Sequence, residues 1–270
     1  MYETIDYHCD DDEGVGTITL NRPHCKNAID IPMRTELRDL VERLRYDRGL
    51  RALIITGAGG NFCSGGDLSA LQAEVGKDSA DVEARRQRLV DLQPLVAGLI
   101  QFDRPVIAAV TGVAFGAGLG LALAADFILA ADDARFCAVF GRVGAVPDFG
   151  TFYTLPRAVG VQRARELVYS AREIGAAEAL AMGLVLEVHA PQQLLGRARA
   201  IARSLAQASQ ATLSISKRAL NVSCNADLQT MLAMESDGQG IALSTAYHDT
   251  SVKRFLAKEG PMFRWPERQA

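Results

Sequence analysis

The sequence predicts an α/β fold with parallel strands and a helical C-terminal region. Short apolar segments rich in β-branched residues alternate with longer amphipathic segments through the first two thirds of the chain. The clearest short segments are 14–23, 52–57, 105–110 and 126–131. Strands separated by helices are typical of parallel sheets. Beyond residue 190 the apolar spacing is helical, so we expect a core at 1–190 and a helical region at 191–270.

The first elements are a strand pair and a helix. The alternating segment 14–23 is expected to pair with 4–9 across the acidic turn DDDEG. A helix is predicted over 32–46, because it begins with Pro32 and carries one apolar stripe. That stripe consists of Met33, Leu37, Leu40, Val41 and Leu44.

The later elements follow the same alternation. Residues 84–102 predict a helix with a kink at Pro94. Further strands are expected at 134–139 and 183–190. The predicted C-terminal helices are 192–208, 211–222 and 227–246. Asp126 is expected to position a strand, and Ser214, Ser216 and Lys217 to face solvent.

Composition narrows the class of protein. The 270 residues are 49% hydrophobic and 23% charged, which is enough for a sizeable core. The formal net charge of −3 argues against a general nucleic-acid binder. No apolar run reaches the roughly 20 residues of a membrane span, and no signal peptide is evident, so we expect a cytoplasmic protein. The 5 cysteines form no CxxC pair, which argues against a metal site or disulfide framework.

Two glycine-rich segments each follow an apolar strand: ITGAGGNFCSGGDL (55–68) and VTGVAFGAGLG (110–120). Unpaired N–H groups at a helix N-terminus carry partial positive charge, and glycine permits close approach of a ligand oxygen. Two such turns side by side predict an oxyanion hole for a carbonyl substrate that develops enolate character. Tight turns with close helix packing are the alternative. A dinucleotide site is disfavoured because GAGLG does not complete GxGxxG.

Four motifs in order resemble the enoyl-CoA hydratase/isomerase (crotonase) superfamily. They are RPxxxNAI (Arg22 to Ile29), NFCSGGDL (61–68), RPVIAAVTGVAFGAGLGLALAAD (104–126) and VPDFGTFYTLPRAVG (146–160). The resemblance implies a crotonase-like spiral of ββα units with a helical C-terminal trimerisation region. It also implies an acyl-CoA thioester substrate and a homotrimer or a dimer of trimers. No separate cofactor is implied, because coenzyme A is part of the substrate.

The resemblance also assigns binding residues. It places the oxyanion hole at the backbone N–H groups of Gly66 and Ala117. The implied contacts with coenzyme A come from Cys25, Lys26, Ala28, Gly66, Asp67 and Leu68. Asp67 has an alternative role as a loop cap, and Arg22 and His24 have surface roles as alternatives to phosphate binding.

The sequence departs from the hydratase pattern at two positions. Hydratases of this superfamily use two glutamates around a water, one as base and one as acid. Gly120 and Phe140 occupy those positions here. Neither side chain can transfer a proton, which argues against ordinary enoyl-CoA hydration.

One acid, Asp148, remains in register with double-bond isomerases of the superfamily. Dehalogenases also have a carboxylate near this position, but the histidine that assists it is absent around Gln93. An N-cap of a helix beginning near Gly150 is the structural alternative. An apolar wall would raise the pKa of Asp148, and the expected acyl-pocket residues are Phe140, Val143, Phe149 and Phe152.

The sequence therefore predicts an enoyl-CoA isomerase in which Asp148 moves the proton. One alternative is a hydratase, lyase or hydrolase of CoA esters that uses a non-standard acid. The other is a catalytically silent homologue that binds CoA esters or a protein partner.

Overall fold

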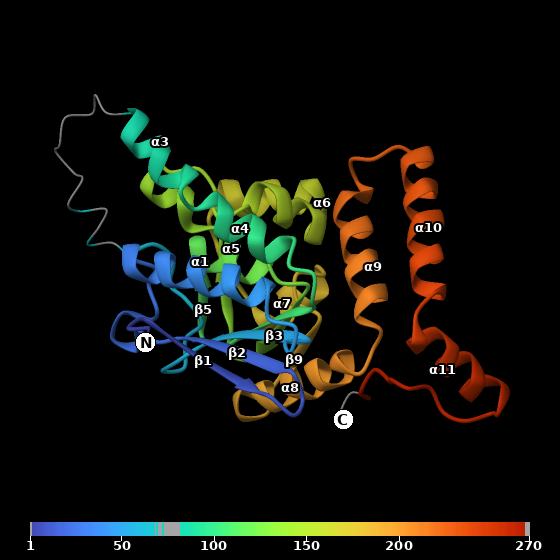
Figure 1. Ribbon diagram of the computed structural model, residues 1–270. Helices are drawn as coiled ribbons and strands as arrows, with labels where there is room; N and C mark the ends of the chain where they lie inside the picture. The colour runs from blue at the N-terminus through green and yellow to red at the C-terminus, as the bar shows by residue number, and fades with distance from the viewer. Residues whose placement is uncertain (1, 68, 70–71, 73–81, 268–270) are drawn as a thin grey trace.

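A six-stranded sheet forms the centre of the molecule in the computed structural model, which describes residues 2–67, 69, 72 and 82–267 (Figure 1). Its strands, in spatial order, are β1 (Ile5–Asp10), β2 (Val15–Leu20), β3 (Ala52–Gly57), β4 (Val106–Val110), β6 (Phe127–Ala131) and β9 (Glu187–His189). β1 and β2 form an antiparallel hairpin, and the four later pairings are parallel. The predicted parallel α/β arrangement is thus confirmed.

A second sheet of three short strands lies beside the first. It consists of β5 (Val113–Phe115), β7 (Arg135–Cys137) and β8 (Glu173–Gly175), in that order. The sequence predicted only the middle strand. All three strands have three residues, and only the middle one lies within an apolar segment, 134–139, that the sequence marks as a strand.

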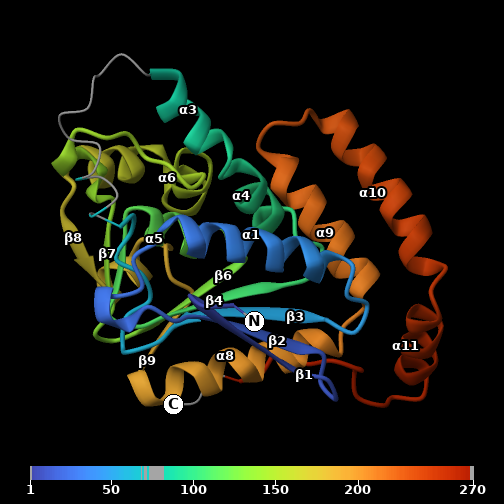
Figure 2. The same cartoon turned by 60° about the vertical axis from the view of Figure 1, so that its left-hand side comes forward.

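Helices cover both faces of the main sheet (Figures 1 and 2). One face packs against α1 (Ile31–Arg45), α4 (Gln93–Ile100) and α5 (Ala117–Leu123). The other packs against α8 (Pro191–Ala206). Strand residues alternate between the two cores, since Leu53 and Ile55 contact the first and Ala52 and Ile54 the second.

The stripe predicted for the first helix is confirmed, because its five apolar residues are buried in α1. The helix predicted over 84–102 is instead two helices, α3 (Val82–Val90) and α4. The break comes at Asp91 and Leu92, and Pro94 lies in the first turn of α4. Proline is favoured at a helix start, where its missing N–H has no intrahelical partner.

Four elements remain before the C-terminal region in the described part of the chain. They are the 3-10 turns η1 (Pro23–Cys25) and η2 (Val139–Val143), and the helices α6 (Thr151–Ser170) and α7 (Ala176–Ala181). Within the described residues, no helix is both long and apolar enough to cross a bilayer.

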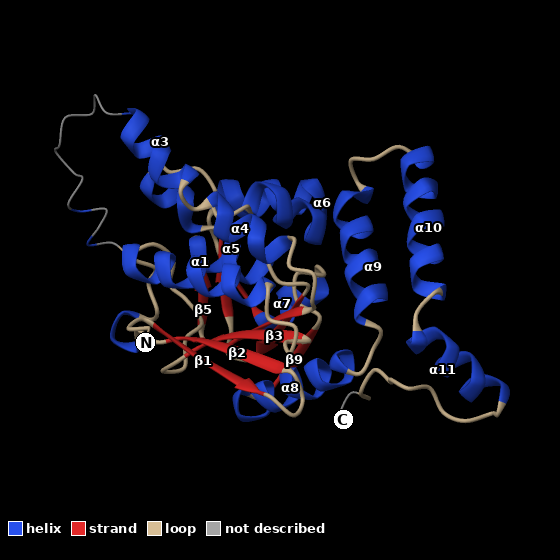
Figure 3. Cartoon of the chain, viewed as in Figure 1, coloured by secondary structure: helices blue, strands red, loops and turns tan. Residues whose placement is uncertain are grey.

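The C-terminal region is helical, as predicted. It contains α8, α9 (Gln210–Ser223), α10 (Leu228–Leu243) and α11 (Ala246–Leu256). α8 lies under the sheet as part of the core, so the core extends beyond residue 190. Figures 1 and 3 show α9 beside α6, and α10 and α11 farther from the sheet.

Candidate active site

The segment 63–67 is held in an extended conformation between two neighbours. On one side the Cys63 N–H donates to Val113 O at 2.8 Å, which ties the segment to β5. On the other side the Ile29 N–H donates to Gly65 O at 2.7 Å, and the Asp67 N–H to Ile29 O at 3.0 Å. N–H groups alternate sides along an extended chain, so the Gly66 N–H points away from Ile29. Among the described residues it has no internal acceptor.

α5 begins directly beside this segment. Ala117 is its first residue, so its N–H has no intrahelical acceptor, and no other described residue accepts it. Gly118 permits the contact: a Cβ at this position would lie 2.3 Å from Cys63 O. Gly65 has a φ of +105°, and its Cβ would lie 3.7 Å from Ala117 N. These glycines bring the two unpaired N–H groups to neighbouring positions, which is the arrangement an oxyanion hole requires.

Asp148 lies in the segment 147–150, which is wedged between α5 and α4. A Cβ on Gly120 of α5 would lie 2.5 Å from Phe149 Cβ. A Cβ on Gly150 would lie 2.8 Å from Val96 Cγ1 of α4. Phe149 has a φ of +49°, a left-handed conformation that costs about 1–3 kcal/mol in a non-glycine residue. Tight packing on both sides holds the segment in this strained conformation, one helical turn from Ala117.

The carboxylate of Asp148 does not cap a helix. Gly150 is the N-cap of α6 and has no side-chain cap. Thr151 donates its N–H to the backbone oxygen of Asp148, at 2.9 Å. The Asp148 Oδ1 atom is buried and has no hydrogen-bond partner among the described residues.

Burial raises the pKa of Asp148 from its ordinary 3.8 to about 6, because the charged form loses solvation. Its own backbone N–H and the cation of Arg34 on α1 oppose the shift. The resulting pKa is suited to a group that both accepts and returns a proton near neutral pH.

Both positions that the resemblance aligns with hydratase glutamates are tightly packed. Gly120 contacts the acid segment so closely that any side chain would overlap Phe149 and Thr151. Phe140 is buried, and its Cε1 lies 3.8 Å from the position of a Cβ on Gly116. The aromatic ring therefore packs next to the N-cap of α5.

The structure divides the four predicted acyl-pocket residues. Phe140 and Phe149 are buried, whereas Val143 and Phe152 are 62% and 63% exposed. Neither Val143 nor Phe152 is part of a buried wall in the single chain, and their place in an acyl pocket stays a prediction. Val143 ends the surface turn η2, and Phe152 lies on the outer side of the first turn of α6.

The residues assigned to coenzyme A border the donor segment. Lys26 is exposed, Cys25 is half-buried, and Ala28 is buried. The Ser64 N–H donates to Lys26 O at 3.0 Å, which joins this stretch to the segment containing Gly66. Leu68 lies outside the described residues.

Asp67 and Arg22 have structural partners. Asp67 accepts hydrogen bonds from Ser69 and forms an ion pair with Arg22 at 3.0 Å, and these contacts lower its pKa. Arg22 also pairs with Asp30 at 3.2 Å and donates to Ala28 O at 2.6 Å. Asp67 is thus the loop cap considered as its alternative role, and Arg22 braces the stretch rather than facing outward.

Cys63 is the nearest thiol to the two donors. It is fully buried, and burial raises its pKa to about 12. A thiol with this pKa is not ionised near neutral pH, and the thiolate is the nucleophilic form. The site is therefore not built for catalysis by a cysteine nucleophile.

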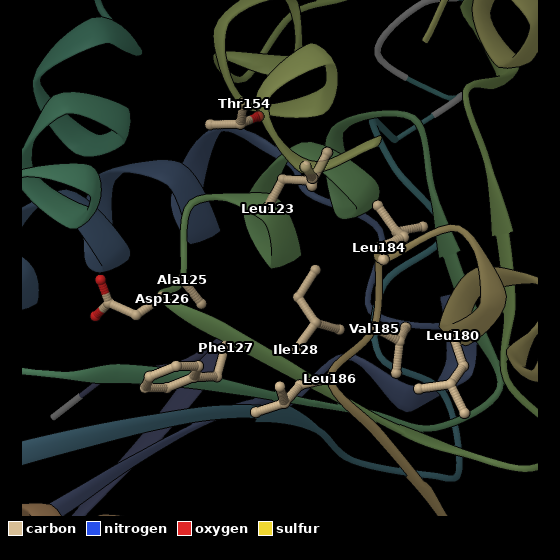
Figure 4. A pocket seen from close by; sticks show the side chains of 12 residues that line it. Leu123, Ala125, Asp126, Phe127, Ile128, Thr154, Leu180, Leu184, Val185 and Leu186 are labelled. Atoms are coloured by element: carbon tan, nitrogen blue, oxygen red, sulfur yellow. The ribbon is translucent and has the colours of Figure 1, made fainter. Parts of the chain in front are cut away.

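Two hollows in the described part of the chain lie away from these groups. One, of about 420 Å³, lies between the end of α5, β6, α6 and residues 180–186 (Figure 4). The other, of about 560 Å³, is formed by α11 and residues 259–263. Figure 4 shows Asp126 directed away from the apolar side chains of the first hollow. Neither hollow is lined by Gly66, Ala117 or Asp148.

Asp126 and Lys217 form an ion pair beside the first hollow. Asp126 Oδ2 accepts the Val106 N–H at 2.7 Å, which confirms that it positions β4. It also binds Lys217 Nζ at 2.7 Å. The expectation that Lys217 faces solvent is therefore wrong: its side chain links α9 to the core, because a partner distant in sequence lies beneath it.

Three features that shape the site are not evident from the sequence. Gly65 and Gly118 were part of the glycine-rich motifs, but which backbone each would approach was not evident. Arg34 lies on the predicted helix, yet its proximity to Asp148 is a tertiary property.

The fold and site define a class of protein: an α/β fold in which two backbone N–H groups without an acceptor among the described residues, and a carboxyl group with a buried, unpaired oxygen, lie on neighbouring segments. Comparison with known proteins places this class in a family. The sequence profile described as "Enoyl-CoA hydratase/isomerase" matches residues 10–266.

Individual relatives match along the whole chain. The 1,2-epoxyphenylacetyl-CoA isomerase of Escherichia coli K12 is 35% identical, covering 97% of this chain and 99% of the relative. A probable enoyl-CoA hydratase of Rhodobacter capsulatus is 38% identical over 97% and 98%. The crystal structure of an enoyl-CoA hydratase/isomerase from Cupriavidus metallidurans CH34 has 41% identity and a TM-score of 0.93, covering 100% of this chain and 99% of that one.

The chain belongs to the enoyl-CoA hydratase/isomerase family. The crotonase fold predicted from the four motifs is confirmed, and the chain is an acyl-CoA-processing enzyme of this superfamily.

Proposed function

We propose that the protein is an enoyl-CoA double-bond isomerase that uses Asp148 as its only acid–base group. The observation that carries the proposal is the Asp148 carboxyl group, which has a buried oxygen without a hydrogen-bond partner among the described residues and a pKa of about 6 that suits proton transfer. The two positions that would supply a hydratase's acid and base hold Gly120 and Phe140.

In this mechanism the acyl-CoA carbonyl oxygen accepts hydrogen bonds from the N–H groups of Gly66 and Ala117. Asp148 removes a proton from the α-carbon of a 3-enoyl thioester, and the electron pair moves onto the carbonyl oxygen to give a dienolate. The two N–H donors stabilise that charge. Protonated Asp148 then returns the proton to the γ-carbon, which completes the shift of the double bond without a second acid.

Similarity to the E. coli epoxide isomerase favours a second candidate reaction. Isomerisation of a ring epoxide of an aromatic CoA ester also begins at a CoA thioester. The aromatic rings of Phe140 and Phe149 would suit such an acyl group. Other relatives are named hydratases, but hydration here would need an acid–base group that the two substituted positions do not supply.

We further propose that the chain binds coenzyme A along residues 25–28 and 66–68 and assembles as a homotrimer or a dimer of trimers. Exposed apolar side chains on α9, α10 and α11 support this assembly. They include Leu220, Leu228, Leu232, Ile241, Phe255 and Leu256.

A substrate panel tests the proposed function. The purified enzyme is incubated with 2-enoyl-, 3-enoyl- and epoxyphenylacetyl-CoA, and the products are resolved by chromatography. We expect conversion of 3-enoyl- to 2-enoyl-CoA with little hydration. Rapid hydration of crotonyl-CoA would contradict the proposal. Turnover of the epoxide alone would favour the second reaction, and binding without turnover a silent homologue.

A further inference from the structure

The first turn of α6, which follows the acid segment, is anchored to α9. The hydroxyl of Tyr153 donates to the backbone oxygen of Asn221 on α9. The guanidinium of Arg157 stacks on the Tyr153 ring, 3.5 Å from its centroid, and donates to Asn225 Oδ1 at 2.7 Å. α6 is therefore fixed to the C-terminal region only a few residues beyond Asp148.

The same residue of α9 is bonded to α4. Asn221 Nδ2 donates to the backbone oxygen of Ile100 at 2.8 Å. Ile100 is the last residue of α4, so this carbonyl has no intrahelical donor, and the amide satisfies it. One residue of α9 thus joins the end of α4 to the beginning of α6.

α4 and α6 enclose the acid segment. Val96 and Ile100 of α4 lie 2.8 Å and 3.5 Å from the position of a Cβ on Gly150. The N–H of Tyr153 donates to Gly150 O at 2.8 Å. Separation of the two helices would release Gly150, relax the left-handed conformation of Phe149 and let water reach Asp148.

We propose that Tyr153 and Asn221 are positioning residues: by joining α6 and α4 through α9, they hold Asp148 in its buried location beside the two N–H donors. Neither side chain has a role in proton transfer. The catalytic part of this inference rests on the proposed function, whereas the location of the carboxyl group does not.

The test compares Tyr153→Phe and Asn221→Ala with the wild type. Tyr169→Phe is the matched control, because Tyr169 lies on the same helix with its side chain 80% exposed. For each protein, kcat and KM are measured with 3-enoyl-CoA. The pKa of the Asp148 carboxyl group is measured from the pH dependence of the ¹³C chemical shift of its carboxyl carbon, and Asp148→Asn identifies that signal.

We expect kcat to fall roughly tenfold in both variants while KM changes little, because small displacements of a reacting group slow chemistry strongly. The measured pKa of Asp148 should move from about 6 toward 3.8 as water reaches the carboxyl group. Tyr169→Phe should match the wild type in both measurements.

An unchanged kcat and an unchanged Asp148 pKa in both variants would overturn the inference, even if their melting temperatures fell. Tyr153→Phe removes a single hydroxyl and decides the matter alone if Asn221→Ala does not fold. If the wild type isomerises no enoyl-CoA, the proposed function fails, and the Asp148 pKa still decides whether the two residues position the carboxyl group.

Discussion

Asp148 combines an unpaired carboxyl oxygen with tight packing of the backbone that follows it. One carboxyl oxygen is buried without a hydrogen bond among the described residues, and the backbone at Phe149 and Gly150 is tightly packed. Such a group is costly in its charged form, which is why the pKa rises. Strain and an unpaired polar atom at one position are typical of functional sites.

The pH dependence of catalysis follows from this pKa. Asp148 must be ionised to accept a proton, so activity should rise with pH, reach half its maximum near pH 6 and then remain level. The measurement is kcat/KM for 3-enoyl-CoA between pH 4.5 and pH 8. A midpoint near pH 4 would show that the active acid is not the buried carboxyl group.

The same pKa predicts an effect on stability. The pKa of Asp148 is higher in the folded chain than its ordinary 3.8, so the folded state binds more protons between about pH 4 and pH 6. Raising the pH through this window lowers the free energy of unfolding. At pH 7.5 the free energy of unfolding of Asp148→Asn, measured in urea, should therefore exceed that of the wild type by about 1–3 kcal/mol. This difference should disappear near pH 4.

Asp39→Asn is the matched control for that experiment, because Asp39 lies on α1 with its side chain 58% exposed. It should leave stability nearly unchanged at both pH values. Equal stability of Asp148→Asn and the wild type at pH 7.5 would show that the carboxyl group is not buried in its charged form.

Sequence identified single residues where a motif fixed their register. Gly66, Ala117 and Asp148 were singled out in this way, and their roles stay predictions. Residues whose environment depends on distant partners were not: Lys217 was expected in solvent but pairs with Asp126, and Phe152 was expected in a buried wall but is exposed. Helical periodicity does not report which surface another helix covers.

At the scale of elements, the glycines of α5 set how closely it approaches its neighbours. Gly118 admits the backbone at Cys63, and Gly120 admits Phe149. A helix with these glycines is intrinsically weak, at about 1 kcal/mol for each, and its burial between neighbours compensates. The glycines therefore allow the segments at Cys63 and Phe149 to lie close to α5, at a cost in helix stability.

Gly120→Ala tests this spacing. A Cβ would lie 2.5 Å from Phe149 Cβ, so α5 and α6 must separate, and we expect a loss of about 1–3 kcal/mol in unfolding free energy. Gly196→Ala in α8 is the control, because a Cβ there meets no atom within 4 Å. It should stabilise the chain by about 0.5–1 kcal/mol. Equal stability of Gly120→Ala and the wild type in urea would refute the close approach.

Elements were predictable from sequence where an apolar segment marked them. The strands of the main sheet and α1 matched their apolar patterns. β5 and β8, of three residues each, are held by pairing with β7 rather than by a pattern of their own. The break between α3 and α4 was misplaced because Pro94 is compatible with either a kink or a helix start.

At the scale of the whole molecule, α9 is bonded to the core while α10 and α11 extend beyond it. Lys217, Asn221 and the Tyr153 hydroxyl tie α9 down. The apolar side chains exposed on α10 and α11 form a surface that a second copy of the chain would cover. α9 thus lies between the proposed active site and the proposed association surface and is bonded to the core.

Phe255→Asp tests the association surface. Phe255 on α11 is 81% exposed, and a charge there should weaken contacts between copies. Light scattering during size-exclusion chromatography should give three or six times the 29.0 kDa chain for the wild type and a smaller mass for the variant. Val82→Asp on α3, at a residue 70% exposed, should leave the mass unchanged. A monomeric wild type would contradict the proposed assembly.

The most direct test of the central claim is the rate at which Asp148→Asn isomerises 3-enoyl-CoA. The substitution preserves shape and removes the group that carries the proton. We predict that kcat falls by roughly 10²–10⁴-fold while the affinity for the CoA ester is retained, as measured by calorimetry with a saturated acyl-CoA. A variant that isomerises 3-enoyl-CoA as fast as the wild type would contradict the assignment of Asp148 as the proton carrier.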